Sequence, residues 1–136
     1  MKVLWVSRHG ILPAQAKFLM RKFKSFKIEF FRDKVSSAEW LVKNVVLPKE
    51  IDVVIPVLPL SMVARLVELG KKLNFEVWWA QMELLHNDYE EKCQNFDDDR
   101  DVMVPGLDSE GKKIWRHYRF KGFYRIKEVK LELEEV

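Results

Sequence analysis

The hydrophobic positions along residues 1–82 change three times from a period of about two to one of about 3.6 and back. The first period is typical of strands and the second of helices, so this pattern predicts repeated strand-helix units. Four short apolar runs are the expected strands: Lys2–Ser7, Lys27–Arg32, Ile51–Leu58 and Phe75–Met82. The first and third are almost entirely apolar, which is typical of parallel strands buried on both faces.

Three helices are expected between these strands. The first begins near Pro13, because proline suits the first turn of a helix. Ser36 followed three residues later by Glu39 predicts a capping box at the start of the second. The third is expected to have Ser61 as its N-cap and to end near Asn74.

Right-handed strand-helix-strand units place their parallel strands in one sheet. The simplest result is an α/β fold, a three-layer Rossmann-like sandwich with sheet order 2-1-3-4 over residues 1–82. Residues 83–111 predict an acidic loop with a short strand at 102–104, and residues 112–136 predict antiparallel edge strands, with Gly122 as a turn or bulge. Alternation near the end of the chain is carried by Val129, Leu131 and Leu133. One domain is therefore expected over residues 1–136.

Composition favours a folded protein of the cell interior. Of the 136 residues, 48% are apolar and 33% are charged, which argues against a disordered chain. Cys93 is the single cysteine, so an internal disulfide and a multi-thiolate zinc site are excluded, and a reducing cytoplasm is expected. The N-terminus lacks a signal-peptide pattern and no apolar run approaches the ~20 residues of a membrane span, so no membrane partner is expected. Abundant Glu, Lys and Arg are typical of thermophiles.

Charge is unevenly distributed although the net charge is only +3. Residues 1–34 carry nine basic and two acidic side chains, residues 83–101 carry two and eight, and residues 112–130 carry eight and one. This segregation predicts two basic surfaces and one acidic segment, and it favours an anionic partner.

Two loops are candidates for binding that partner. Ligands of open α/β sheets bind beyond the carboxyl ends of the strands where the strand order reverses, here between the first and third strands. The loops Ser7–Gly10 and Pro56–Ser61 follow those strands, and each leads into a helix whose first amides carry partial positive charge. We therefore predict a crevice for a phosphate-bearing ligand. Its predicted residues are Ser7, Arg8, His9, Gly10, Pro59, Ser61 and Arg65. The alternative is that Arg8 and His9 only solvate a loop.

Three segments carry a resemblance to a known family: Ser7–Gln15, Asp52–Ile55 and Arg116–Phe120. Together they resemble the small CRISPR-associated Rossmann-like proteins, which sense or cleave cyclic oligoadenylates and some of which are called ring nucleases. The resemblance implies a homodimer with one shared anion pocket, and metal-independent cleavage in which the RNA 2′-hydroxyl is the nucleophile. It also implies that His9 is the general acid or base and that Arg8 stabilises negative charge, with no cofactor. Ser61 and Gln15 would then position the ligand.

The aromatic and basic run Ile114–Arg125 supports an alternative function, a non-enzymatic module that binds nucleic acid or protein. Aromatic faces stack on bases and cations meet phosphates. The cationic positions of this candidate surface are Arg116, His117, Arg119, Lys121 and Arg125. An alternating edge strand would produce the same pattern without any ligand.

The acidic segment predicts no metal site. Asp97–Asp99 and Asp101 do not have the spacing of a calcium-binding loop, so a solvated loop is expected. His86 and His117 are expected to be surface or hydrogen-bonded histidines. Cys93 lies among acids, which disfavour a thiolate, so it is not expected to be a nucleophile.

Overall fold

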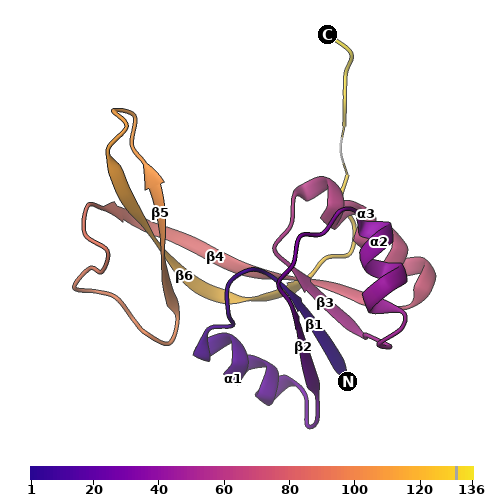
Figure 1. The fold of residues 1–136 in the computed structure, drawn as a ribbon. Coiled ribbons are helices and arrows are strands. Elements are labelled where there is room, and N and C mark those ends of the chain that lie inside the picture. Colours follow the sequence, from indigo (N-terminus) through magenta and orange to yellow (C-terminus); the bar gives the residue numbers. More distant parts are fainter. Residues whose placement is uncertain (131) are drawn as a thin grey trace. The chain divides into compact units, whose positions relative to one another are not determined.

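The computed structural model describes residues 1–130 and 132–136, which form a mixed α/β fold with six strands and three α-helices (Figure 1). The second α-helix continues directly into a short π-helix, η1. In chain order the elements are β1 (Lys2–Val6), α1 (Pro13–Lys22), β2 (Lys27–Phe31), α2 (Ala38–Leu41), η1 (Val42–Val46), β3 (Val53–Pro56), α3 (Leu60–Leu73), β4 (Glu76–Asp88), β5 (Asp101–Leu107) and β6 (Lys113–Arg125). None of the described helices is long and apolar enough to cross a membrane.

The chain divides into two compact units, and the six-stranded sheet has the order β2-β1-β3-β4-β6-β5. The first unit comprises residues 1–10, 25–79 and 124–136. The second unit comprises residues 11–24 and 80–123. The long strands β4 and β6 contribute residues to both units.

Parallel pairing organises the first unit. β1 lies between β2 and β3, so that Trp5 is opposite both Phe30 and Ile55. β3 pairs in parallel with the start of β4. Because neighbouring parallel strands end at the same edge, Val6 at the end of β1 lies opposite Pro56 at the end of β3.

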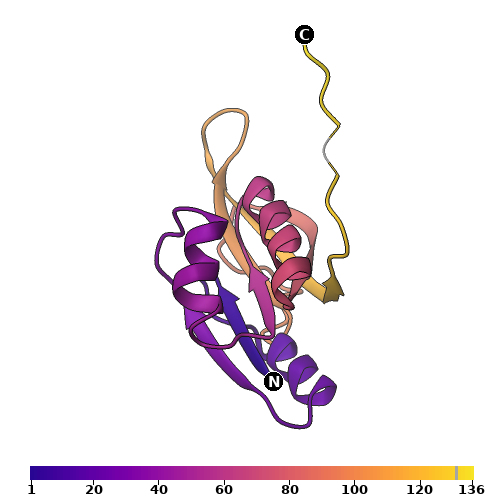
Figure 2. The same cartoon turned by 90° about the vertical axis from the view of Figure 1, so that its right-hand side faces the viewer.

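The core of the first unit joins this sheet to two helices, which lie side by side in Figures 1 and 2. Leu4 and Val54 point from the sheet into a cluster that includes Leu41 of α2 and Leu66 of α3. Each such side chain stabilises the fold by roughly 1.5–3 kcal/mol through burial. The opposite sheet face is also buried, at Val3, Trp5, Val53 and Ile55. The three-layer arrangement itself stays a prediction.

Two predicted helix starts are wrong by one or two residues. Ser37, rather than Ser36, is the N-cap of α2: its extended backbone lets its Oγ accept a 3.0 Å hydrogen bond from the Trp40 amide. Helix α3 begins one residue before Ser61, with Pro59 in the cap position, so Ser61 lies inside the first turn. Asn74 at the other end of α3 has the left-handed backbone, with φ of 65°, that favours helix termination, as predicted.

The second unit is built on longer strands than the sequence predicts. β4 continues to Asp88 rather than ending at Met82, and β5 spans seven residues where a strand at 102–104 was expected. β5 and β6 form an antiparallel hairpin in which Asp101 is opposite Arg119. Its turn is held by Asp108, whose Oδ1 accepts hydrogen bonds from two backbone amides. The acidic loop is therefore confined to the segment between β4 and β5.

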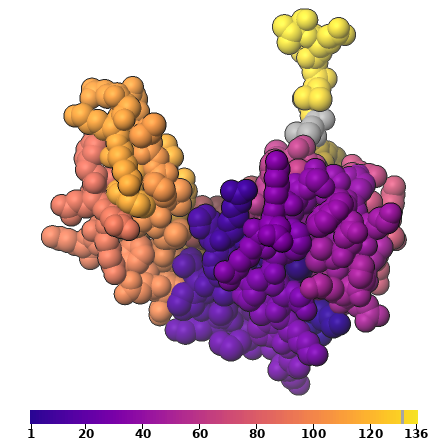
Figure 3. Space-filling model, in the orientation of Figure 1, coloured from indigo at the N-terminus to yellow at the C-terminus, as the bar shows by residue number. Residues whose placement is uncertain are grey.

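Several antiparallel strands were expected over residues 112–136, but β6 is the one strand among the residues of this segment that the structure describes. After β6, residues 126–130 and 132–136 adopt no strand, although Ile126 and Val129 pack against the core of the first unit. Figure 3 shows the last residues extending from that unit, where Leu133 is 90% exposed. Leu131 lies outside the described residues. Residues 132–136 form no strand, because apolar side chains that stay exposed gain nothing from a pleated surface.

Candidate functional site

A hollow of about 370 Å³ opens in the first unit where β1 and β3 end. The loop after β1 borders it through Ser7, Arg8 and His9, and the loop after β3 borders it through Pro59. These four residues belong to the predicted site. Further lining residues come from the segment after β2, at Asp33, Lys34 and Val35. The wall also includes Val6, Val57, Leu58 and Met62.

The backbone of the loop after β1 is held from both sides. Ser7 is buried, and its Oγ accepts a 3.1 Å hydrogen bond from the His9 amide. Trp5 Nε1 donates a 3.3 Å hydrogen bond to the His9 carbonyl oxygen. The Ser7 hydroxyl therefore orders the loop, and the His9 imidazole extends from a fixed backbone into solvent.

Basic side chains border the hollow without an ion-pair partner among the described residues. Arg8, His9 and Lys34 are exposed, and none of their side chains forms a hydrogen bond or ion pair with any residue that the structure describes. Asp33 is the one acid in the lining, so the formal charge of the lining is +1 when His9 is neutral. Unpaired cations around one concave surface attract an anion.

The start of α3 adds further positive potential. The first hydrogen bond of this 14-residue helix runs from the Met62 amide to the Pro59 carbonyl, so the amides of Leu60 and Ser61 precede it. No side chain caps this end. The N-terminus of a helix carries about half a positive charge, which favours a phosphate or carboxylate nearby.

Four predicted ligand-binding residues do not line the hollow: Gly10, Gln15, Ser61 and Arg65. Arg65 pairs with Glu39 and Glu68, and these hydrogen bonds raise the pKa of its guanidinium. Gln15 belongs to the second unit and is buried. Its Oε1 accepts a 2.8 Å hydrogen bond from the Leu12 amide at the start of α1, so the residue that the resemblance implied as a ligand contact caps its own helix.

A second hollow in the first unit, of about 290 Å³, lies near the other end of α3. Lys71, Arg125 and Lys127 are among its lining residues together with Glu76, so it also holds more basic than acidic side chains, and Arg125 pairs with Glu76 at 2.9 Å. The C-terminal end of a helix carries partial negative charge, which disfavours an anion. We therefore take the hollow at the ends of β1 and β3, where cations unpaired among the described residues meet the N-terminal end of α3, as the candidate anion site.

The candidate nucleic-acid surface on β6 is largely used within the protein. His117 is completely buried, which corrects its assignment to a surface. Arg119 pairs with Asp101, Lys121 with Glu83 at 3.2 Å, and Arg125 with Glu76. Arg116 lies over Gly106, where an added Cβ would meet its guanidinium at 2.6 Å. The basic side chains of β6 therefore mostly form ion pairs with acidic residues of neighbouring strands, and they do not form a free cationic face.

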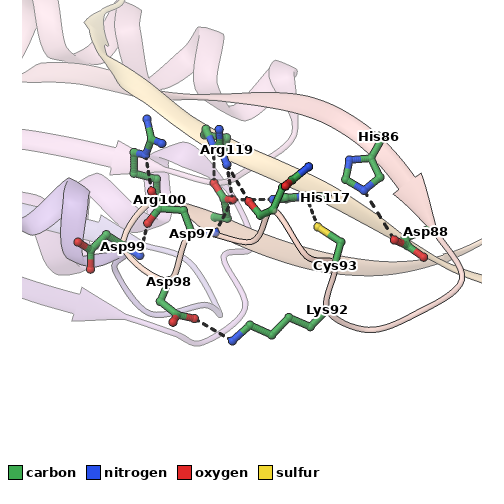
Figure 4. A network of polar contacts seen from close by, with 12 residues as sticks. His86, Asp88, Lys92, Cys93, Asp97, Asp98, Asp99, Arg100, His117 and Arg119 are labelled. Carbon is green, nitrogen blue, oxygen red and sulfur yellow. Dashed lines mark hydrogen bonds and ion pairs between the residues drawn. The ribbon is translucent and has the colours of Figure 1, made fainter.

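A buried polar cluster that the sequence did not predict occupies the second unit (Figure 4). Cys93 Sγ lies 3.0 Å from His117 Nδ1, and His117 Nε2 lies 2.6 Å from Asp101 Oδ2. Arg119 donates two hydrogen bonds to the same carboxylate, at 2.7 and 2.9 Å. The Asp97 amide donates a fourth, at 2.8 Å. The short Asp97–Asp99 segment therefore serves to position Asp101.

The charge of Asp101 is strongly stabilised in this cluster. Burial alone would raise the pKa of its carboxyl, but hydrogen bonds from Arg119, from the Asp97 amide and from His117 outweigh burial and hold the pKa well below its usual range. In return, Asp101 raises the pKa of the Arg119 guanidinium. Asp101 is therefore an ionised hydrogen-bond acceptor at neutral pH.

Comparison with known proteins adds no assignment. A scan against protein-family models and searches of curated proteins and solved structures found no match. Function therefore has to be argued from the hollow and the buried cluster themselves.

Proposed function

We propose that the hollow at the ends of β1 and β3 binds a phosphate-bearing ligand of the nucleotide class. The observation that carries this proposal is the meeting of Arg8, Lys34 and the start of α3 around one concave surface, with both cations unpaired among the described residues. Phosphate oxygens would accept hydrogen bonds from these groups. The apolar wall, which includes Val35 and Leu58, suits a base or another flat ring.

A cyclic or linear oligonucleotide is the more specific ligand that we propose, because of the resemblance to CRISPR-associated Rossmann-like proteins. Several phosphates on one ligand would engage several cations at once. In metal-independent cleavage, the His9 imidazole would take the proton of an RNA 2′-hydroxyl while that oxygen bonds to the adjacent phosphorus. The bond from phosphorus to the 5′-oxygen would break, which leaves a 2′,3′-cyclic phosphate and a 5′-hydroxyl that takes its proton from the imidazolium. Arg8 would stabilise the negative charge on the phosphate oxygens. The pairing of two chains that the resemblance implies stays a prediction.

Binding to a panel of AMP, ATP, linear oligoadenylate and cyclic oligoadenylate, measured by calorimetry at low and high salt, tests the proposal. Arg8→Ala should weaken nucleotide binding by about 10- to 100-fold, since a hydrogen bond to a charged group contributes about 1.5–3 kcal/mol. The matched control is Arg21→Ala, which removes an exposed arginine of α1 outside the hollow. The affinity should also fall as salt rises.

Two results would overturn this function. One is the absence of binding by every nucleotide in the panel, and the other is equal loss of affinity in Arg8→Ala and Arg21→Ala. Product analysis with His9→Ala then separates an enzyme from a sensor. Loss of turnover with binding retained would indicate catalysis by His9, whereas a bound and uncleaved ligand in the unsubstituted protein would indicate a sensor.

A further inference from the structure

We infer that the second unit contains a binding site for a zinc-like transition-metal ion, formed by His86, Cys93 and His117. One donor atom from each of these side chains lies within 4.8 Å of the other two. Two imidazole nitrogens and one thiolate form a donor set that zinc prefers, whereas calcium and magnesium prefer oxygen. All three residues belong to the second unit, so this inference does not rest on the function proposed for the hollow.

The donor separations, which run from 3.0 Å up to at most 4.8 Å, bracket those of a tetrahedral zinc site. Zinc binds sulfur at about 2.3 Å and nitrogen at about 2.0–2.1 Å, which places the ligand atoms of a tetrahedral site roughly 3.4–3.6 Å apart. Cys93 Sγ and His117 Nδ1 lie 3.0 Å apart and would separate slightly to admit the ion. His86 extends from β4 with 41% of its side chain exposed, so it can rotate toward the other two.

His117 is already oriented as a metal ligand. The ionised Asp101 carboxylate can only accept, so the 2.6 Å contact requires His117 Nε2 to carry the proton. When the ring is neutral, this tautomer presents the lone pair of Nδ1 toward Cys93. A carboxylate behind the imidazole is the usual outer partner of zinc-bound histidines, and here Arg119 fixes that carboxylate in turn.

Carboxylates lie beside both histidines of the inferred site. His86 also has a carboxylate beside its ring, since Asp88 Oδ2 lies 3.7 Å from His86 Nε2 (Figure 4). The His86 and His117 rings meet edge to face with centroids 5.0 Å apart. Two histidines, each beside its own carboxylate, thus converge on one half-buried thiol.

Metal binding would change the protonation of one group. Cys93 would bind as a thiolate and release its proton to solvent, while His117 would bind through Nδ1, with Nε2 still donating to Asp101. Three protein ligands leave a fourth position for water or a substrate atom, and the exposed edge of His86 provides access. A thiol nucleophile paired with His117 is the competing interpretation, but it gives His86 no role.

Titration of the full chain with Zn²⁺, and with Co²⁺ as a spectroscopic probe after treatment with a chelator, tests the site. We expect one ion per chain, a sulfur-to-cobalt charge-transfer band, and protection of Cys93 from alkylation by added Zn²⁺. His86→Ala should weaken binding at least 10-fold, and Cys93→Ser should abolish the charge-transfer band. Because His86 is exposed, its removal should leave the fold intact.

The controls separate this site from adventitious binding. His9→Ala removes a histidine of the first unit, and Asp98→Asn removes an exposed acid of the loop between β4 and β5. Both should bind the metal as the unsubstituted protein does. The inference is overturned if the unsubstituted chain binds neither ion, if His86→Ala binds as tightly as the parent, or if Asp98→Asn weakens binding as much as His86→Ala does.

Discussion

At the scale of single residues, Asp101 has the largest structural role in the second unit. Its carboxylate accepts hydrogen bonds from Arg119, His117 and the Asp97 amide, and its side chain has no solvent exposure. If the carboxylate were neutralised, each of these donors would lose its charged acceptor, and the stability of the fold would fall.

We therefore expect Asp101→Asn to lower the free energy of unfolding by about 3–5 kcal/mol, the range measured when one partner of a buried ion pair is removed. Urea denaturation followed by circular dichroism measures this change. Asp98→Asn is the control, because Asp98 is exposed and its loss should change stability by no more than about 0.5 kcal/mol. Equal effects of the two substitutions would contradict the role assigned to Asp101.

The sequence indicates where Arg8 and His9 lie more directly than it indicates the contacts of the buried cluster. Arg8 and His9 directly follow a strand, so their place at its carboxyl end follows from local order. Cys93 lies in a loop and His117 in a strand, 24 residues apart in the sequence. The spacing of hydrophobic residues therefore does not predict that they are in contact. The available signal was the hairpin: a turn centred near residue 110 places Asp101 opposite Arg119, two positions from His117.

At the scale of elements, Gly70 fixes how α3 connects to β4. A Cβ at this position would lie 2.5 Å from the Phe75 carbonyl oxygen and 3.2 Å from the Phe75 ring. The Phe75 amide also bonds to the Gly70 carbonyl, so the chain turns tightly around this glycine. Only a residue without a side chain permits that approach.

Gly70→Ala should consequently destabilise the protein by about 1–3 kcal/mol, the usual cost of overpacking. Helix propensity alone predicts the opposite sign, since alanine is favoured over glycine by about 1 kcal/mol. Gly10→Ala is the matched control: no atom lies within 4 Å of its added Cβ, so stability should be unchanged or slightly higher. Thermal unfolding of both variants decides between the two effects, and a stabilised Gly70→Ala would refute the steric argument.

Elements of the first unit were easier to predict than those of the second. Strands β1 and β3 are short and apolar, and a helix follows each of them, so the local sequence is enough to predict both. β4 was expected to end at Met82 because charge begins there, yet it continues to Asp88 beside β6. Pairing with a strand that is distant in sequence, rather than local composition, makes those residues a strand.

At the scale of the whole molecule, the two candidate sites fall in different units. The hollow uses residues of the first unit only, and the donors His86, Cys93 and His117 belong to the second. A ligand stabilises whatever part of a protein must be folded to bind it, by about 2.7 kcal/mol at a concentration 100 times its dissociation constant. Each ligand should therefore slow the local unfolding of the unit that binds it more than that of the other unit.

Hydrogen exchange measured by mass spectrometry tests this expectation. Added Zn²⁺ should slow amide exchange in β5 and in residues 80–88 of β4, and leave β1 and β3 nearly unchanged. A bound nucleotide should slow exchange in residues 7–9 and 57–62 instead, because these segments border the hollow. His86→Ala and Arg8→Ala should each remove one of the two responses and keep the other. Equal slowing of both units by either ligand would show that the chain opens as one cooperative body, and would contradict the independence of the two sites.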